Sequence, residues 1–238
     1  MATVRLDAGE FYYAEYGDPA GMPLVLLHGM PRDHSSWAGI APELVADGLR
    51  VIAPDLRGHG TSARTSAYSF ELMREDLHQL AGALRLDRFV LGGHSAGGTV
   101  ATLFAERYPD RLAGLILVDS PPPDGSGSYD PGPRPEGDLP YDWAVMPAIL
   151  GQLSHPDPAW WADLPAITAP ALLIGGGSTS PVPQDLLAKA SRLMPDGSLV
   201  TIEGAGHSVH QSRPAEFLAA VRPFLRRVRE VSGQALNS

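Results

Sequence analysis

The chain has 238 residues, a length that suits one α/β domain with a substantial buried core. Its formal net charge of -9 argues against nucleic acid or an anionic membrane surface as a partner, because both are bound through excess Lys and Arg. The absence of cysteine excludes a disulfide framework and a thiol nucleophile. The N-terminal residues lack the charged-then-apolar pattern of a signal peptide, and no run approaches about 18 apolar residues, so we expect a soluble, cytoplasmic protein.

The first third of the chain predicts strands that alternate with helices. Residues 4–17 show a mixed alternation that ends at a Gly-Asp-Pro turn, which predicts an opening pair of antiparallel strands. The short, continuous apolar run at 23–27 is typical of a strand that is covered on both faces. A helix at 33–46, a strand at 50–55 and a helix at 70–84 are expected to follow.

The central feature of the chain is the stretch 88–98, in which an apolar run ends in glycines around Ser95. Read as Gly93-x-Ser95-x-Gly97, it matches the nucleophile elbow, a strand-to-helix turn that holds the serine in a strained backbone conformation with its hydroxyl exposed. Glycine is needed two positions before and after the serine, because a side chain there would collide with the neighbouring strand and helix. The alternative is a glycine-rich turn of another α/β protein. A phosphate-binding loop is disfavoured, because no Lys-Ser or Lys-Thr pair follows.

Two backbone amides are placed to stabilise a negative oxygen beside Ser95. Met30 follows the strand at 23–27 in a His-Gly-Met loop, and Ala96 stands directly after the serine at the expected helix N-terminus. Two such donors are the minimum for an oxyanion hole. The alternative interpretation of the Met30 loop is an ordinary turn at the end of a strand.

Four short motifs occur in order along nearly the whole chain: His28-Gly29-Met30-Pro31, Asp55-Leu56-Arg57-Gly58-His59-Gly60, Gly93-His94-Ser95-Ala96-Gly97-Gly98 and Gly204-Ala205-Gly206-His207. With these motifs the chain resembles the α/β-hydrolase family. The resemblance implies an α/β fold with a mostly parallel, twisted sheet of about eight strands, flanked by helices, and a site at the carboxyl ends of the strands.

A nucleophilic serine needs a base, because an alcohol is scarcely ionised near neutrality. His207 follows an alternating strand at 198–203 and matches the position of the family's histidine. His210 is the nearest rival, and it is otherwise a polar group at the pocket rim that contacts substrate. The sequence contains no HExxH motif or clustered Asp and His spacing, so no metal and no cofactor are expected.

The acid is where the sequence departs from the common family pattern. Many members of the family carry an aspartate in the loop after the strand at 170–176, but this chain has Thr179 there. A threonine cannot stabilise an imidazolium as a carboxylate does.

Some members of the family supply the acid at the end of the strand that follows the nucleophile helix. That strand, at 112–118, is followed here by Asp119. A lone carboxylate that closes an apolar strand is costly unless it is paired, and we therefore predict that Asp119 orients His207. The alternatives are that Asp119 only caps the turn that follows it, or that Asp185 supplies the acid.

Residues 120–169 are predicted to form a lid inserted into a core made of 1–119 and 170–238. This stretch holds 11 of the 23 prolines and three of the four tryptophans. So much proline excludes long helices in its first half, whereas the apolar spacing at 141–153 predicts a short amphipathic helix. Trp143 and Met146 are the residues of this helix that we expect to meet substrate, in addition to holding the lid to the core.

These features predict a serine hydrolase that cleaves a carboxylic ester or lactone through an acyl-enzyme intermediate, with an uncharged, hydrophobic small molecule as substrate. The same triad would also serve for a thioester, for carbon-carbon cleavage or for a biosynthetic cyclisation. A ligand-binding protein that has kept the pocket is the non-enzymatic alternative, and Thr179 is its best support. The family's aspartate-nucleophile branches, the dehalogenases and epoxide hydrolases, are disfavoured because position 95 is serine.

Overall fold

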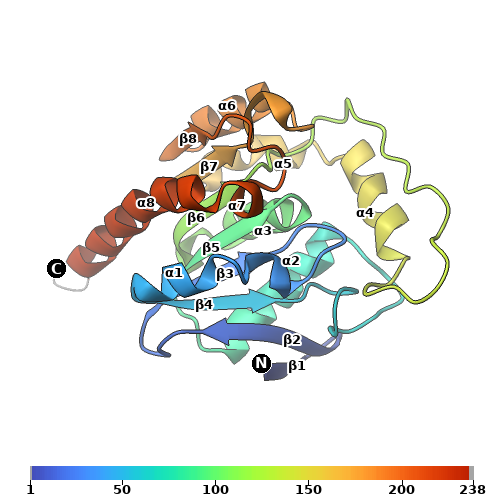
Figure 1. Cartoon of the computed structure of the whole chain (residues 1–238), viewed down its shortest axis with the longest axis horizontal. Helices are drawn as coiled ribbons and strands as arrows, with labels where there is room; N and C mark the ends of the chain where they lie inside the picture. The colour runs from blue at the N-terminus through green and yellow to red at the C-terminus, as the bar shows by residue number, and fades with distance from the viewer. Residues whose placement is uncertain (1, 236–238) are drawn as a thin grey trace.

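The fold is built on one sheet, seen here in a computed structural model that describes residues 2–235. Within these residues the sheet has eight strands in the order β1-β2-β4-β3-β5-β6-β7-β8 (Figure 1). The strands are β1 (Ala2–Leu6), β2 (Gly9–Tyr16), β3 (Met22–Leu27), β4 (Leu49–Pro54), β5 (Phe89–His94), β6 (Leu112–Val118), β7 (Ala171–Gly175) and β8 (Gly197–Thr201). β1 and β2 are antiparallel, as the sequence predicts, and all pairings from β4 through β8 are parallel. The fold is the predicted α/β-hydrolase fold.

Helices cover both faces of the sheet. They are η1 (His34–Trp37), α1 (Ala41–Ala46), α2 (Phe70–Ala83), α3 (Ala96–Arg107), η2 (Pro109–Arg111), α4 (Val145–Ser154), α5 (Ala159–Ala162), η3 (Leu164–Ala166), η4 (Gly177–Thr179), α6 (Gln184–Leu193), α7 (Val209–Ser212) and α8 (Pro214–Ala235). The core on one face is shared with α2, α3 and α6, and the core on the other with η1, α1 and α8. The central strands β5 and β6 are consequently buried along their whole length, which explains their continuous apolar sequence.

Two predicted helices differ from those observed. The helix expected over 33–46 is divided into η1 and α1, because Pro42 lacks the amide that an unbroken helix needs and instead stands in the first turn of α1. The helix expected over 141–153 begins only at Val145, because Tyr141 is paired with His59 in an isolated β-bridge.

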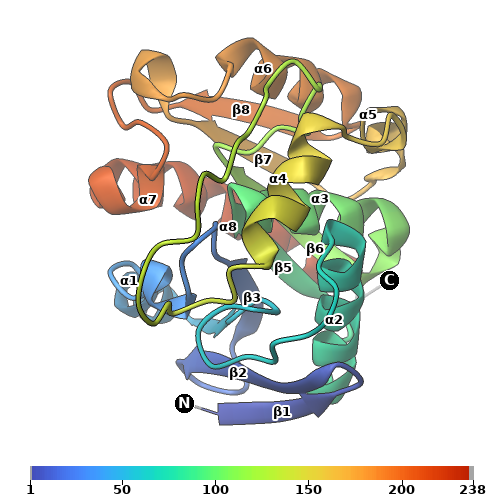
Figure 2. The same cartoon turned by 90° about the vertical axis from the view of Figure 1, so that its right-hand side faces the viewer.

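The stretch between β6 and β7 projects at the end of the sheet to which β4 points (Figure 1), and in Figure 2 its helix α4 lies in front of the strands. Val145 and Ile149 of α4 are fully buried in the core. Residues 120–140 contain no helix or strand, as their prolines predict. The last part of the stretch between β6 and β7 packs on the core, because Trp160, Leu164 and Ile167 are buried beside α2 and α3. No helix among the described residues is both long enough and apolar enough to cross a membrane.

Candidate active site

Ser95 lies in the turn between β5 and α3, with a φ of 52°. Residues other than glycine rarely adopt a positive φ, so the backbone of the serine is held in a strained conformation. A Cβ added at Gly93 would collide with the carbonyl group of Gly97, and one added at Gly97 would collide with the carbonyl oxygen of His28 at the end of β3. The structural reason predicted for the two glycines is therefore confirmed.

The end of β6 fixes the backbone of Ser95 from both sides. The amide of Ser95 donates to the carbonyl oxygen of Val118 at 3.2 Å. The hydroxyl of Ser120 donates to the carbonyl oxygen of Ser95 at 2.7 Å. Asp119 stands between these two residues, so one three-residue segment holds the serine and carries the carboxylate predicted as acid.

Asp119 and His207 are paired, 88 positions apart in the chain. The Oδ2 atom of Asp119 lies 2.8 Å from Nδ1 of His207. The side chain of Asp119 is fully buried, whereas that of His207 is 33% exposed. Because Nδ1–H of His207 donates a hydrogen bond to Asp119, the other ring nitrogen, Nε2, carries the lone pair of the neutral ring.

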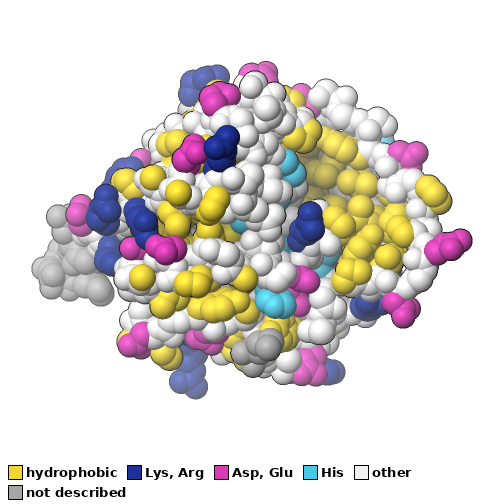
Figure 3. All heavy atoms as spheres, viewed as in Figure 1, with side chains coloured by type: hydrophobic (Ala, Val, Ile, Leu, Met, Phe, Trp, Pro, Cys, Tyr) yellow, Lys and Arg dark blue, Asp and Glu magenta, His cyan; other side chains and the backbone are white. Residues whose placement is uncertain are grey.

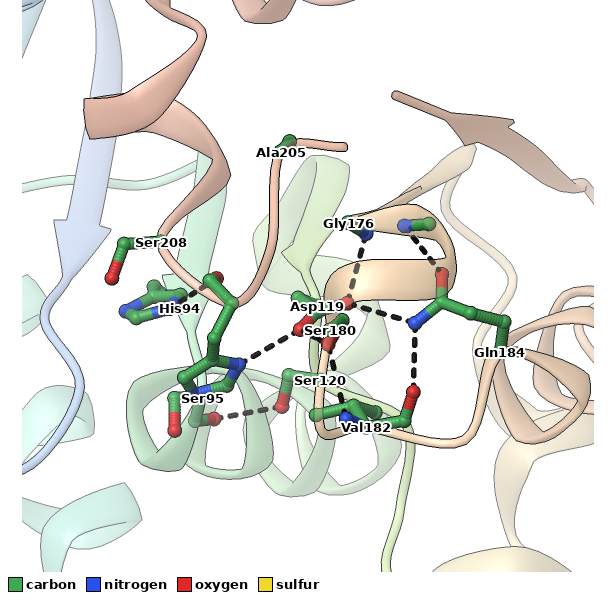
Figure 4. A network of polar contacts seen from close by, with 12 residues as sticks. His94, Ser95, Asp119, Ser120, Gly176, Ser180, Val182, Gln184, Ala205 and Ser208 are labelled. Carbon is green, nitrogen blue, oxygen red and sulfur yellow. Dashed lines mark hydrogen bonds and ion pairs between the residues drawn. The ribbon is translucent and has the colours of Figure 1, made fainter. Parts of the chain in front are cut away.

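The carboxylate of Asp119 is the centre of a hydrogen-bond network (Figure 4). It accepts from the hydroxyl of Ser180 at 2.5 Å, the amide of Gly176 at 3.0 Å and the side-chain amide of Gln184 at 3.2 Å, besides the bond from His207. Burial by itself would raise the pKa of Asp119, but these four bonds outweigh it and hold the pKa below its ordinary value. The group is therefore a stable carboxylate.

Ser180 and Gln184 are two contacts of Asp119 that the sequence reasoning missed. Ser180 lies in the loop after β7, where many members of the family carry the acid, and Gln184 is the first residue of α6. Thr179 in that loop is exposed. The loop instead supplies donors to a carboxylate on the neighbouring strand. A chemical signal could have predicted these two residues. A buried carboxylate needs hydrogen-bond donors, and the polar side chains that follow the next strand are the nearest ones.

The two amides predicted as oxyanion donors come from the segments that flank Ser95. Ala96 is the first residue of α3, so its amide has no acceptor within the helix. Met30 lies in the loop after β3, and this loop packs tightly on the elbow. A Cβ added at its Gly29 would lie 3.0 Å from Cβ of Ser95. The interpretation of these amides as an oxyanion hole remains a prediction.

A cavity of about 430 Å³ opens beside the serine and is lined by Ser95, Asp119 and His207. Its other walls come from α3, from the irregular stretch 120–129, from Leu153 and from residues 181–186. On the side where the stretch between β6 and β7 projects, the surface is hollowed and hydrophobic (Figure 3). The volume is within the range of small-molecule sites.

Three residues predicted to contact substrate lie outside this cavity. Trp143 and Met146 are absent from its lining. The cavity wall beside the serine is formed by the irregular stretch 120–129 and by Leu153 near the end of α4, and not by residues near the start of α4. His210 is only 2% exposed and is stacked on Trp37, with 4.0 Å between the ring centroids. This cavity gives no support to substrate contact by Trp143, Met146 and His210, which stays a prediction.

Asp33, His34 and Asp55 form the one group among the described residues whose potential metal-ligand atoms all lie within 4.8 Å of one another. Protein donors already occupy its carboxylates. Asp55 accepts from the amide of His34 at 2.8 Å and lies 2.7 Å from its Nδ1, and Asp33 accepts from Ser35. These bonds account for the arrangement of the cluster.

Comparison with known proteins places the chain among hydrolases. The family model for the alpha/beta hydrolase fold matches residues 22–141. A solved structure of a thermophilic esterase from Thermogutta terrifontis is 30% identical, with a TM-score of 0.81 and coverage of 96% of this chain and 99% of that one. Esterase YbfF of Escherichia coli (strain K12) is 27% identical over 241 residues, which are 85% of this chain and 92% of that protein.

A third relative matches only in part. Epoxide hydrolase 3 of Xenopus tropicalis is 38% identical over 127 residues, but this chain spans only 34% of its length. The family match over half of the chain agrees with the strand order and with the elbow at Ser95. The chain belongs to the α/β-hydrolase fold family.

Proposed function

We propose that the chain is a serine hydrolase that cleaves a carboxylic ester or lactone through an acyl-enzyme intermediate. The observation that carries the proposal is the bond between Asp119 and His207 beside the cavity that Ser95 also lines. The similarity to two esterases supports ester hydrolysis in general. Soluble small-molecule esters fit a cavity of this size.

In the proposed reaction, Nε2 of His207 takes the proton of the Ser95 hydroxyl while the serine oxygen attacks the carbonyl carbon. Asp119 holds Nδ1 protonated and stabilises the imidazolium that forms. The amides of Met30 and Ala96 hold the negative oxygen of the tetrahedral intermediate. His207 then gives its proton to the leaving alcohol, and a water molecule repeats the sequence to release the acid.

The cavity walls favour an uncharged substrate with an apolar acyl group. Proline, valine and leucine side chains form part of the cavity wall, from Pro181, Val182, Pro183 and Leu186. No Lys or Arg lines the cavity in the part of the chain that the structure describes, so an acyl group that carries a carboxylate has no counter-ion there.

Two alternatives have specific support. Local identity to an epoxide hydrolase extends over about half of the chain, but Ser95 stands at the nucleophile position that is an aspartate in that branch. The absence of an acid at position 179 supported a binding protein without catalysis, and the bond between Asp119 and His207 weakens that support. A thioester or a carbon-carbon bond as the target of the same triad remains an alternative.

The test is covalent labelling together with turnover. A fluorophosphonate probe should label the wild-type chain, whereas Ser95→Ala and His207→Ala should remain unlabelled. Hydrolysis of short p-nitrophenyl esters and of a lactone series should fall by several orders of magnitude in both variants. A wild-type chain that is neither labelled nor active on any ester, lactone or thioester would leave the binding protein as the better reading.

A further inference from the structure

The turn that carries His207 is held partly by other segments. It contains Gly204 and Gly206, whose φ angles of 71° and 68° lie in the region that favours glycine. Besides its internal bond from the amide of Ala205 to the carbonyl oxygen of Ile202 at 3.2 Å, the turn receives contacts from outside. Two of them act near the histidine: the amide of Gly206 donates to the carbonyl oxygen of Gly176 at 3.0 Å, and the carbonyl oxygen of His207 accepts from His94.

His94 makes the second contact with its ring. Its Nε2 lies 2.9 Å from the carbonyl oxygen of His207, so Nε2 carries the proton and donates. The side chain is 6% exposed. Burial and the neighbouring His207 lower the pKa of His94 to about 4, so the ring is a neutral donor at pH 7.

The other edge of the same ring meets the loop that carries Met30. A Cβ added at Gly29 would lie 2.8 Å from Nδ1 of His94, so only a glycine allows the loop to pack this closely. His94 also precedes Ser95 directly and ends β5, where it pairs with Val118. One residue, through its ring and its backbone, therefore meets all three segments on which the proposed chemistry depends.

A buried aromatic stack prevents this ring from moving away. His210 meets His94 edge-to-face, with 4.9 Å between the ring centroids, and Trp37 stacks on His210 at 4.0 Å. Trp37 is fully buried. In the described part of the chain neither ring nitrogen of His210 has a hydrogen-bond partner, so packing is the contact that this ring provides.

We propose that His94 is a positioning residue that holds the backbone of His207 and the loop of Met30 at fixed distances from Ser95. This inference rests on the proposed serine-hydrolase function. His94 acts through His207, whose ring lies 4.7 Å from its own between the centroids. Its donated bond fixes where the base stands, and its other edge fixes where the first oxyanion amide stands.

The test compares substitutions of His94 that separate its hydrogen bond to the carbonyl oxygen of His207 from the packing of its ring. In His94→Gln the side-chain amide retains a donor of similar reach, whereas His94→Phe retains a ring without a donor. Misplacing a catalytic group by about 1 Å costs up to about 100-fold in rate. We expect His94→Phe to lower kcat for a p-nitrophenyl ester by 10- to 100-fold with KM changed less than about twofold, and His94→Gln to recover most of the loss.

A matched control measures the cost of replacing any packed histidine. His78 in α2 stacks on Tyr108 with 4.2 Å between the ring centroids and lies outside the cavity. His78→Phe and His78→Gln should leave kcat and KM near the wild-type values. Equal kcat in His94→Phe and His94→Gln, or a loss that follows thermal stability in all four variants, would overturn the proposal.

A second measurement does not depend on turnover. The proton on Nδ1 of His207, shared with Asp119, should give a strongly deshielded NMR signal in the wild-type chain and in His94→Gln. In His94→Phe the signal should broaden or disappear. An unchanged signal in His94→Phe contradicts the positioning role, whereas a chain that shows the expected signals but hydrolyses nothing contradicts only the proposed function.

Discussion

Backbone strain in this molecule is concentrated at the proposed chemistry. Among the described residues, the non-glycine residues with positive φ are Arg85, Ser95 and Asp119, at 54°, 52° and 49°. Each such conformation costs on the order of 1–3 kcal/mol and persists only where the surroundings enforce it. For Asp119 the surroundings are the four hydrogen bonds that its carboxylate accepts. For Ser95 they are the two hydrogen bonds that its backbone makes with Val118 and Ser120 at the end of β6.

The identity of the acid can be tested by exchanging single atoms. Asp119→Asn retains the shape but puts an amide against Nδ1 of His207, which favours the wrong tautomer, and kcat should fall by about 10³- to 10⁴-fold. Thr179→Ala alters an exposed side chain without a hydrogen bond among the described residues, and kcat should stay within about twofold. Steady-state kinetics with p-nitrophenyl butyrate, together with thermal melting to verify folding, checks both expectations.

The opposite order would assign the acid to the loop after β7 and reject Asp119. A loss in both variants that is accompanied by a lower melting temperature would indicate a damaged fold, and Asp185→Asn then serves as the comparison. Asp185 lies in the first turn of α6. We expect its substitution to leave kcat near the wild-type value.

At the scale of elements, the stretch 120–129 forms part of the cavity wall. It contributes Asp124, an exposed carboxylate that accepts from the amide of Ser126 at 3.0 Å. Its hydrogen bonds to Ser126 lower the pKa of Asp124, so it is negative at neutral pH. A carboxylate on the cavity wall repels an anionic substrate more than a neutral one.

This repulsion predicts a change in specificity in Asp124→Asn. The ratio of kcat/KM for an ester with a terminal carboxylate to that for its neutral analogue should rise by about two- to fivefold at low salt, and salt should remove the gain. Asp130→Asn is the matched control, because Asp130 accepts from the amide of Gly132 in a similar turn but does not line the cavity. Equal ratios in the two variants would contradict a role of Asp124 in selection.

At the scale of the whole molecule, buried histidines make the fold sensitive to acid. Burial, with smaller contributions from neighbouring histidines, lowers the pKa of His28 to about 3 and that of His94 to about 4. Burial also lowers the pKa values of His59 and His210. The unfolded chain binds protons at these side chains below about pH 6.5. The folded chain binds fewer protons at these side chains because their pKa values are lowered, so the free energy of unfolding decreases as the pH falls below about 6.5.

Glu106 opposes this trend, because burial and then the nearby Asp163 raise its pKa to about 8, so the folded chain retains a proton there that the unfolded chain loses. Each net proton changes the free energy of unfolding by about 1.4 kcal/mol per pH unit. Urea unfolding between pH 6.5 and 5 should therefore show a free energy of unfolding that decreases as the pH falls, by about 1.4 kcal/mol per pH unit for each net proton that the unfolded chain takes up.

A single substitution tests the contribution of one histidine to this pH dependence. His210→Phe preserves the stack on Trp37 and removes one titrating ring, so the slope should decrease by about one proton, or about 1.4 kcal/mol per pH unit. Proton uptake on unfolding, from calorimetry in buffers with different ionisation enthalpies, gives the same number independently. A stability that is flat between pH 6.5 and 5 in the wild-type chain would refute the account.

The sequence predicts those features that depend on local rules. The glycines at 93 and 97 predict the elbow because backbone contact leaves no space for a side chain, and the continuous apolar run at 23–27 predicts the buried strand β3. The pairing of Asp119 with His207 follows from the cost of an isolated buried charge. The contacts of stretch 120–129 could not be predicted, because an irregular chain has no period that tells which side chains face inward.

The loop after β7 contacts both Asp119 and the cavity, and it does so through adjacent residues. Ser180 bonds to Asp119, and the next three residues form part of the cavity wall. A substitution that reshapes the wall thus shifts the hydroxyl that steadies the acid. Engineering of this loop for new acyl groups should consequently trade selectivity against turnover, and libraries that keep Ser180 fixed should recover more active clones than those that randomise it.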